Sequence, residues 1–260
     1  MKRAFALVSL AALFACSAAP EAGDTESDVA VSSQDELVTQ QTFAEVSRIV
    51  NGIRYLPFEY KVDGCYARSL YMSMELAAAG DESNAIFAFA KPGTALQVGN
   101  VRWGYHVAPM LFVGASYQTS RWLVIDPSLS PNALDATTWI ARMGYPAATT
   151  PAPLYPAYSI VPGSAYGPSD PDANAGRAAG TGAAVTDVRD FASMPPFQVR
   201  EVQFACNVMH RYLGNENAAN ATAKKATLVA RTVELLNGLR ARRKTTEDAV
   251  FSAAQCAASN

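Results

Sequence analysis

The chain has 260 residues, of which 50% are hydrophobic, and its formal net charge is −2. This length allows one substantial domain with its own core beside shorter terminal segments. A charge so close to neutral argues against nucleic acid as a partner and against a strongly basic membrane-surface role.

The N-terminus has the pattern of a cleavable export signal. Two basic residues precede an apolar run over residues 4–14, which is too short to cross a bilayer as a stable anchor. The run leads into residues 13–16, Leu-Phe-Ala-Cys, which resemble the lipobox of bacterial lipoproteins, where the cysteine is lipidated and becomes the new N-terminus. We therefore expect residues 1–15 to be a lipoprotein signal peptide and Cys16 to carry the lipid.

This signal sets the expected location of the protein. Ser17 follows the cysteine directly, and a serine at this position resembles the sorting signal of outer-membrane lipoproteins. We therefore expect an exported, outer-membrane lipoprotein. Ordinary signal cleavage within residues 17–19 is the alternative, and it would leave a periplasmic or secreted protein. Residues 16–34 are acidic, small and polar without apolar periodicity, which is typical of a flexible tether.

Residues 35–52 carry apolar side chains at helical spacing before an Asn51-Gly52 stop signal. We expect a helix that packs on the domain. The sequence leaves open a second interpretation, in which this segment is the remnant of an inhibitory segment.

Cys65 stands at the predicted start of a buried helix. An apolar stripe follows it over residues 67–78, and Gly80 is placed as a C-terminal cap. Because the free N–H groups and the dipole at a helix start stabilise a thiolate, this position activates the thiol as a nucleophile. The backbone N–H of Cys65 is also the first expected donor to an oxyanion.

Three strand-like runs follow, at residues 85–90, 103–115 and 121–125. The last two form a predicted antiparallel hairpin, with His106 on its first strand and Asp126 at the end of its second. In such a hairpin Asp126 falls opposite the early part of the first strand, near His106.

His106 is the better of two candidate bases. The chain has only two histidines, and His210 falls on the polar side of a predicted helix, where we expect a surface residue. His106 lies beside a glycine that lets a substrate come close. A carboxylate such as Asp126 would fix the imidazole's tautomer and stabilise its charged form.

The remainder of the chain is predicted to be a long loop followed by helices. Proline and glycine dominate residues 144–185, which we expect to be a surface loop over the site. Helical spacing returns over residues 199–260. With Cys16 lipidated, three cysteines remain, and we expect Cys206 and Cys256 to pair because both lie in this helical region, leaving Cys65 free.

Three blocks in this order resemble the bacterial protein-glutaminase family: Asp63-Gly64-Cys65-Tyr66-Ala67-Arg68, Trp103-Gly104-Tyr105-His106-Val107-Ala108 and Ile125-Asp126-Pro127-Ser128-Leu129. The resemblance covers about residues 58–129. It implies an α+β, papain-like or transglutaminase-like fold, with the nucleophile at a helix N-terminus packed on an antiparallel sheet. It also implies hydrolysis of glutamine side-chain amides in proteins, with Cys65 as nucleophile, His106 as general acid and base, and Asp126 as its orienting partner.

We therefore expect a protein-glutaminase-like catalytic domain over residues 35–198, followed by a C-terminal helical region over residues 199–260. Trp103 and Tyr105 are candidates to line the substrate groove, although packing explains them more simply. Tyr66 and Arg68 are further candidates, and a core aromatic and a salt bridge account for them equally well.

Other activities stay open at this point. The same three residues would serve a papain-like peptidase or a transglutaminase-type acyl transferase, and a non-catalytic surface-binding lipoprotein is a third interpretation. We expect no metal, because the histidines are far apart and there is no Cys-x-x-Cys pair. Phosphate-binding and dinucleotide-binding motifs are also lacking, so no cofactor is expected; the expected partner is a protein or peptide bearing glutamine.

Overall fold

The computed structural model of the chain describes residues 40–90, 93–113, 121–144, 157–167, 175–177, 194–216 and 220–258. Residues 35–260 form one compact unit, so the predicted catalytic domain and the C-terminal helical region pack together. Five helices and a short sixth one surround an antiparallel sheet in the described part of the chain. The predicted α+β class is therefore confirmed.

The central helix is α2 (Cys65–Ala79), which begins at the predicted nucleophile. Gly64 precedes it with a φ of 82°, and Gly80 ends it with a φ of 109°, both left-handed values that favour glycine. The N–H of Gly80 donates to the carbonyls of Leu76 and Ala77, as in a helix cap. Twelve of its residues are buried, because α2 is covered on several sides.

A six-stranded sheet lies against α2. Its strands are all antiparallel, in the order β6-β5-β4-β1-β7-β8. Their bounds are β1 (Asn84–Phe89), β4 (Tyr105–Val113), β5 (Arg121–Val124), β6 (Leu134–Asp135), β7 (Ala157–Pro162) and β8 (Ala175–Arg177). The predicted hairpin is β4-β5, in which Met110 pairs with Val124 and Leu111 with Leu123.

The predicted strand at residues 103–115 is divided in the structure. A separate two-stranded ribbon, β2 (Leu96–Val98) with β3 (Val101–Trp103), ends at Trp103, and β4 starts after Gly104. The glycine therefore separates two strands that belong to different sheets, a use of glycine in strands that local pattern does not reveal.

The expectation of a continuous loop over residues 144–185 is wrong where the structure describes this segment. Residues 157–162 form β7, which pairs along the whole length of β1, and residues 175–177 form β8. Tyr158, Ile160 and Val161 are buried. Because the partner strand lies far away in the sequence and β7 ends at a proline, its apolar residues carry no strong local strand signal. The rest of 144–185, apart from Gly144 and residues 163–167, lies outside the described residues.

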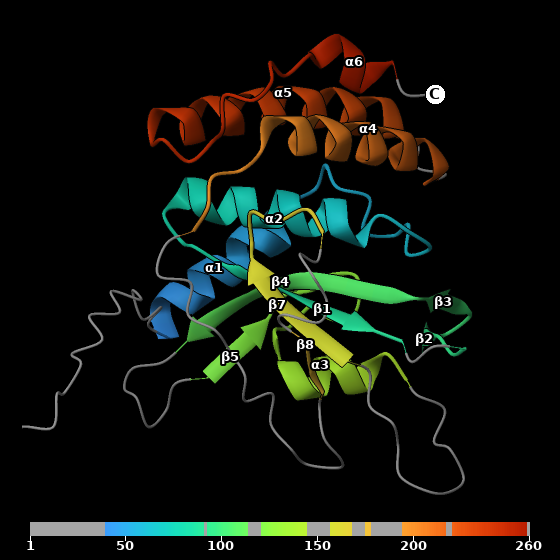
Figure 1. Cartoon of the computed structure of the whole chain (residues 1–260). Helices are drawn as coiled ribbons and strands as arrows, with labels where there is room; N and C mark the ends of the chain where they lie inside the picture. Colours follow the sequence, from blue (N-terminus) through green and yellow to red (C-terminus); the bar gives the residue numbers. More distant parts are fainter. Residues whose placement is uncertain are drawn as a thin grey trace, which may run out of the picture. The chain divides into compact units, whose positions relative to one another are not determined.

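The helices form layers on the two faces of the sheet (Figure 1). Helix α2 contacts β4 on one side and α4 (Val199–Asn215) and α5 (Ala221–Ala241) on the other, so it lies between the sheet and the C-terminal helices. Helix α1 (Gln40–Gly52) packs beside α2. On the opposite face, α3 (Ala136–Arg142) packs against β5 and β6 and places Trp139 in a second apolar core.

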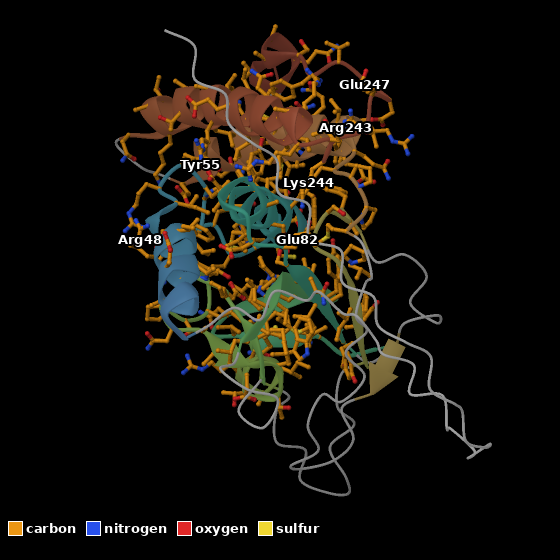
Figure 2. The ribbon with its side chains drawn as sticks, turned by 90° about the vertical axis from the view of Figure 1, so that its left-hand side faces the viewer. Arg48, Tyr55, Glu82, Arg243, Lys244 and Glu247 are labelled. Carbon is orange, nitrogen blue, oxygen red and sulfur yellow. A yellow bond between two sulfur atoms is a disulfide. The ribbon has the colours of Figure 1, made fainter. Side chains whose placement is uncertain are left out.

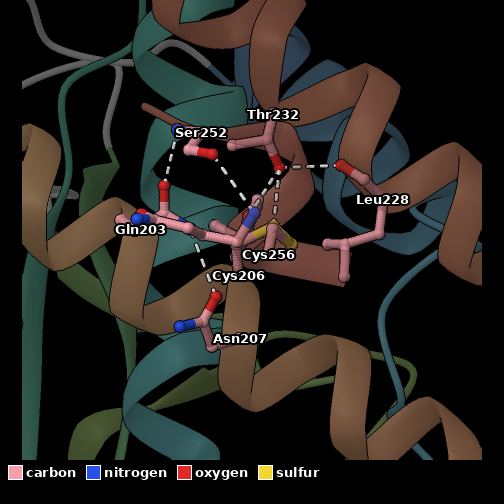
Figure 3. Close-up of a disulfide and its surroundings, with 9 residues drawn as sticks. Gln203, Cys206, Asn207, Leu228, Thr232, Ser252 and Cys256 are labelled. Carbon is pink, nitrogen blue, oxygen red and sulfur yellow. Dashed lines mark hydrogen bonds between the residues drawn. A yellow bond between two sulfur atoms is a disulfide. The ribbon is translucent and has the colours of Figure 1, made fainter. Parts of the chain in front are cut away.

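The C-terminal helices are fastened to each other and to α2. Cys206 of α4 and Cys256 of α6 (Ala253–Ala257) form a disulfide, with Thr232 of α5 packed beside it (Figure 3). Arg231 of α5 makes a two-pronged ion pair with Glu75 of α2, at 2.8 and 2.6 Å. These contacts make α4 to α6 part of the core that surrounds α2.

The end of α5 returns to the turn after α2. Lys244 forms an ion pair with Glu82, and Figure 2 shows the two side chains beside each other. Arg242 donates to the carbonyl of Ala77 at 3.1 Å. Across the described residues, no helix combines the length and the apolar composition that a membrane crossing requires.

Candidate active site

His106 and Asp126 form a buried pair. The Nε2 atom of His106 lies 2.8 Å from Oδ2 of Asp126, and the two residues are 1% and 4% exposed. The hairpin causes this approach, because the N–H of Ile125 donates to the carbonyl of Pro109 at 3.0 Å and continues the β4-β5 pairing. Asp126 follows at once and reaches back to the imidazole.

Asp126 is held by three further donors. The indole N–H of Trp139 donates to Oδ2 at 2.9 Å, and the N–H and hydroxyl of Ser128 donate to Oδ1 at 3.1 and 2.5 Å. Burial raises the pKa of Asp126, but the charge and hydrogen bond of His106, with the bonds from Ser128 and Trp139, outweigh it and lower this pKa to about 2. Asp126 is therefore an ionised carboxylate with a fixed orientation.

The imidazole is held between two indoles. The ring of His106 stacks on Trp103, with centroids 4.8 Å apart, and on Trp139, at 5.7 Å. Burial lowers the pKa of His106, but the charge and hydrogen bond of Asp126, followed by Cys65, raise it to about 9. The ring is thus fixed in place and favoured in its charged form.

Cys65 is a neighbour of this ring. Cys65 is a free cysteine, 5% exposed, at the first residue of α2. Nδ1 of His106 is buried, and Cys65 is the next group after Asp126 that raises the pKa of His106. Cys65 acts on the ring through a side-chain hydrogen bond and through its charge, so the two side chains are neighbours.

Arg68 is a buried charge one turn after Cys65. It is 2% exposed, and its Nη1 atom donates to the carbonyls of Pro57, Tyr60 and Asp63, which belong to the loop before α2. Its Nη2 atom makes no hydrogen bond with a described residue. Burial lowers the pKa of Arg68, and Cys65 and Asp126 are the first of the negative groups that oppose this.

The salt bridge considered for Arg68 is not formed within the described part of the chain, and the guanidinium instead ties the loop carbonyls together. A buried arginine without a carboxylate partner is costly, so a negative group beside it is favoured. Cys65 and Asp126 are the groups that act most strongly on Arg68 in this sense.

The two candidate substrate-binding aromatics occupy different positions. Trp103 is 7% exposed, and its indole N–H donates to the carbonyl of Lys61 at 2.7 Å, so it supports the His106 ring. Tyr105 is half-buried among Phe87 and Phe89, with centroids 6.1 and 6.3 Å away. Their role in substrate binding stays a prediction.

The remaining sequence candidates are a second histidine and three cysteines. His210 is half-buried on α4 rather than fully exposed. Cys206 and Cys256 are joined as a disulfide, and Cys16 lies outside the described residues. Among the described residues, no group of three or more histidine, cysteine, aspartate or glutamate side chains is placed to hold a metal ion.

Sequence reasoning missed Trp139 and the role of Ser128. Ser128 follows the aspartate by two residues, a spacing at which an aspartate accepts from its neighbours in turns, so this contact had a local signal. Trp139 lies on α3, and its contact with Asp126 depends on how α3 folds across the sheet face. No local pattern indicates it.

Residues 37–143 match a family model described as glutaminase. Among solved structures, the chain is similar to a mutant of pro-protein-glutaminase at 22% identity, with a TM-score of 0.43, over 53% of this chain and 51% of that one. It thus spans about half the length of that protein. No curated protein matches the chain.

Two structures of protein-glutaminase show a comparable likeness. A crystal structure has 21% identity and a TM-score of 0.43, over 55% of this chain and 80% of that one. The NMR structure of protein-glutaminase from Chryseobacterium proteolyticum has 21% identity and a TM-score of 0.40, over 56% of this chain and 80% of that one. The family resemblance of the sequence blocks is confirmed by the match to the glutaminase family over residues 37–143, which contain Cys65, His106 and Asp126.

Proposed function

We propose that this protein hydrolyses the side-chain amide of glutamine in proteins or peptides, forming glutamate and releasing ammonia. The observation that carries the proposal is the buried pair of His106 and Asp126, 2.8 Å apart, with Cys65 at a helix start beside the ring. All three residues lie in the segment that matches the glutaminase family.

The proposed mechanism gives each nitrogen of His106 a separate role. Because Nε2 of His106 faces Asp126, its N–H is held there and Nδ1 is left to exchange a proton near Cys65. A pKa of about 9 for His106 favours an imidazolium at neutral pH. In the proposed mechanism this imidazolium is the acid that protonates the leaving group.

The cycle has two halves. The Cys65 thiolate attacks the carboxamide carbon, the C–N bond breaks, and the proton on Nδ1 of His106 passes to the leaving ammonia. Water then attacks the thioester while Nδ1 takes its proton, and the C–S bond breaks to release glutamate and the thiolate. The backbone N–H of Cys65 is the proposed first donor to the oxyanion in both halves.

The proposal is tested by incubating the purified protein with a glutamine-rich substrate protein and measuring ammonia, intact mass and chain fragments. We expect release of ammonia and the mass increase that accompanies conversion of glutamine to glutamate, without chain fragments. The Cys65→Ala variant, whose circular dichroism spectrum should be unchanged, should show neither. Fragments without ammonia would identify a peptidase. Ammonia with incorporation of an added amine would identify an acyl transferase.

We also propose that the protein is lipidated at Cys16 and held at the outer membrane, with residues 16–34 as the tether. The proposal rests on the sequence of residues 4–16 alone. Expression with a labelled fatty acid tests it, since the wild type should take up label and partition into detergent, whereas Cys16→Ser should do neither. An unlabelled wild type with cleavage near residues 17–19 would replace this proposal with simple secretion.

A further inference from the structure

Helix α4 contacts the loop that carries the nucleophile. The hydroxyl of Tyr212 donates to Oδ2 of Asp63 at 2.5 Å, while Oδ1 of the same carboxylate accepts from the N–H of Gly64 at 2.6 Å. Gly64 is the residue directly before Cys65. The Asp63 carboxylate therefore connects α4 to the residue that directly precedes Cys65.

The ring of Tyr212 fits closely against the same loop. A Cβ atom added to Gly64 would lie 2.8 Å from two ring carbons of Tyr212, closer than such atoms approach in proteins. The ring also packs on Tyr60, with centroids 4.5 Å apart. The Tyr212 ring is buried, with 8% of the residue exposed, whereas Asp63 is exposed, so the hydrogen bond between them is part-buried.

A second contact from the end of α4 reinforces the first. Oε1 of Glu216 accepts from the N–H of Glu59 at 3.1 Å, and Oε2 forms an ion pair with Lys224 at 2.8 Å. Arg68 holds the same loop from within α2 through the carbonyls of Tyr60 and Asp63. The loop is thus fixed from both sides, although α4 lies beyond the segment that matches the glutaminase family.

We propose that Tyr212 is a positioning residue for the nucleophile, holding Asp63 with its hydroxyl and Gly64 with its ring so that the sulfur and N–H of Cys65 are correctly placed. The inference rests on the proposed function of Cys65. It assigns to the C-terminal helices a part in catalysis, because a small displacement of a nucleophile sharply lowers the rate.

The matched pair of variants is Tyr212→Phe and Tyr55→Phe. Tyr55 is also buried and also donates to a carboxylate, that of Glu75 on α2, at 2.8 Å, but Glu75 lies ten residues farther along the helix than Cys65. Each variant keeps its ring and loses one hydroxyl. We expect Tyr212→Phe to lower kcat roughly tenfold with KM unchanged, and Tyr55→Phe to lower stability without changing kcat.

The second readout does not depend on substrate. We expect the pH midpoint for alkylation of Cys65 by iodoacetamide to move upward in Tyr212→Phe, because the Asp63 carboxylate, no longer bound by the hydroxyl, is a negative charge free to oppose the thiolate. Tyr66, Arg68, Tyr105 and His106 are the ionisable groups that interact with Cys65 itself, and they are unchanged in both variants. The midpoint should not move in Tyr55→Phe.

A double variant isolates the hydrogen bond. In an Asp63→Ala background, Tyr212→Phe should cost no further kcat, since the bond is already absent. If Tyr212→Phe and Tyr55→Phe lose equal stability, while kcat and the alkylation profile are unchanged in Tyr212→Phe, then Tyr212 has only a structural role. If the wild type releases no ammonia, the proposed function fails, and the alkylation profile alone still shows whether Tyr212 positions Cys65.

Discussion

The buried pair of His106 and Asp126 makes the stability of the folded protein depend on pH in both directions. The folded pKa of His106 is raised from 6.5 to about 9, so its contribution is complete below pH 6.5 and is lost as the pH rises to about 9. The folded pKa of Asp126 is lowered from 3.8 to about 2, so its contribution is complete above pH 3.8 and is lost as the pH falls to about 2.

The first prediction concerns the alkaline side of this profile. In the wild type, this pair should lower the free energy of unfolding as the pH rises from 6.5 to 9. In Asp126→Asn the buried imidazole loses its carboxylate and its pKa falls below the ordinary value, so the contribution of His106 to stability should instead increase with pH below that value. Urea denaturation at several pH values measures both slopes, and identical slopes would contradict the pairing.

The second prediction concerns Trp139, whose indole donates to Asp126. Trp139→Phe keeps an aromatic ring beside His106 but leaves Oδ2 of Asp126 with one donor fewer. Losing a partner of a buried charged group costs about 1–3 kcal/mol, so we expect lower stability and a lower kcat.

Trp122→Phe is the matched control, because Trp122 is half-buried on β5 and packs on Phe112, with centroids 5.2 Å apart. Urea unfolding and steady-state kinetics compare the two variants. If Trp122→Phe lowers kcat as much as Trp139→Phe, the effect comes from general packing and not from the bond to Asp126.

At the scale of elements, the glycines at the two ends of α2 have different structural roles. Both have a positive φ, so alanine at either costs about 1–2 kcal/mol in backbone strain. At Gly80 the added methyl group meets nothing within 4 Å, whereas at Gly64 it would collide with the Tyr212 ring. Gly64 therefore joins two elements, and Gly80 only ends one.

The third prediction follows from this difference. Gly64→Ala should destabilise the protein more than Gly80→Ala and should also lower kcat, because the collision displaces the residue before Cys65. Thermal unfolding and ammonia release, measured on both variants, test the point. Equal effects of the two substitutions would mean that the loop adapts to the methyl group without moving the nucleophile.

At the scale of the whole molecule, a disulfide fastens α6 to α4 across 50 residues of sequence. Chain-entropy reasoning gives a crosslink of this span about 4 kcal/mol of stabilisation, as an upper estimate. Both cysteines are fully buried, and Gln203 of α4 also accepts from the N–H of Ser252 at 2.7 Å (Figure 3). The disulfide thus supports the helix that bears Tyr212.

The fourth prediction is that replacing Cys206 and Cys256 together by alanine lowers the melting temperature by several degrees. Cys65→Ala, which leaves the disulfide intact, serves as the control and should change it far less. Thermal denaturation followed by circular dichroism measures both. An unchanged melting temperature in the double variant would show that packing of α6 alone suffices.

Much of the fold was accessible from the sequence, because its signals are local. The apolar stripe after Cys65 and the cap at Gly80 predicted the helix that begins at Cys65, and the polar residues 116–120 predicted the β4-β5 hairpin. The hairpin in turn predicted that Asp126 lies near His106, and the structure places the two side chains in contact. Their catalytic roles stay predictions.

The sequence by itself determined these elements and the residues that carry the proposed chemistry, since spacing and caps depend only on neighbours along the chain. The tertiary structure alone decided that β7 completes the sheet beside β1, that Trp139 holds Asp126, and that Tyr212 reaches the loop before Cys65. Each of these contacts joins segments whose own sequences give no sign of the partner. Burial of shared apolar surface and the pairing of buried polar groups bring such segments together, and those forces act on the folded chain as a whole.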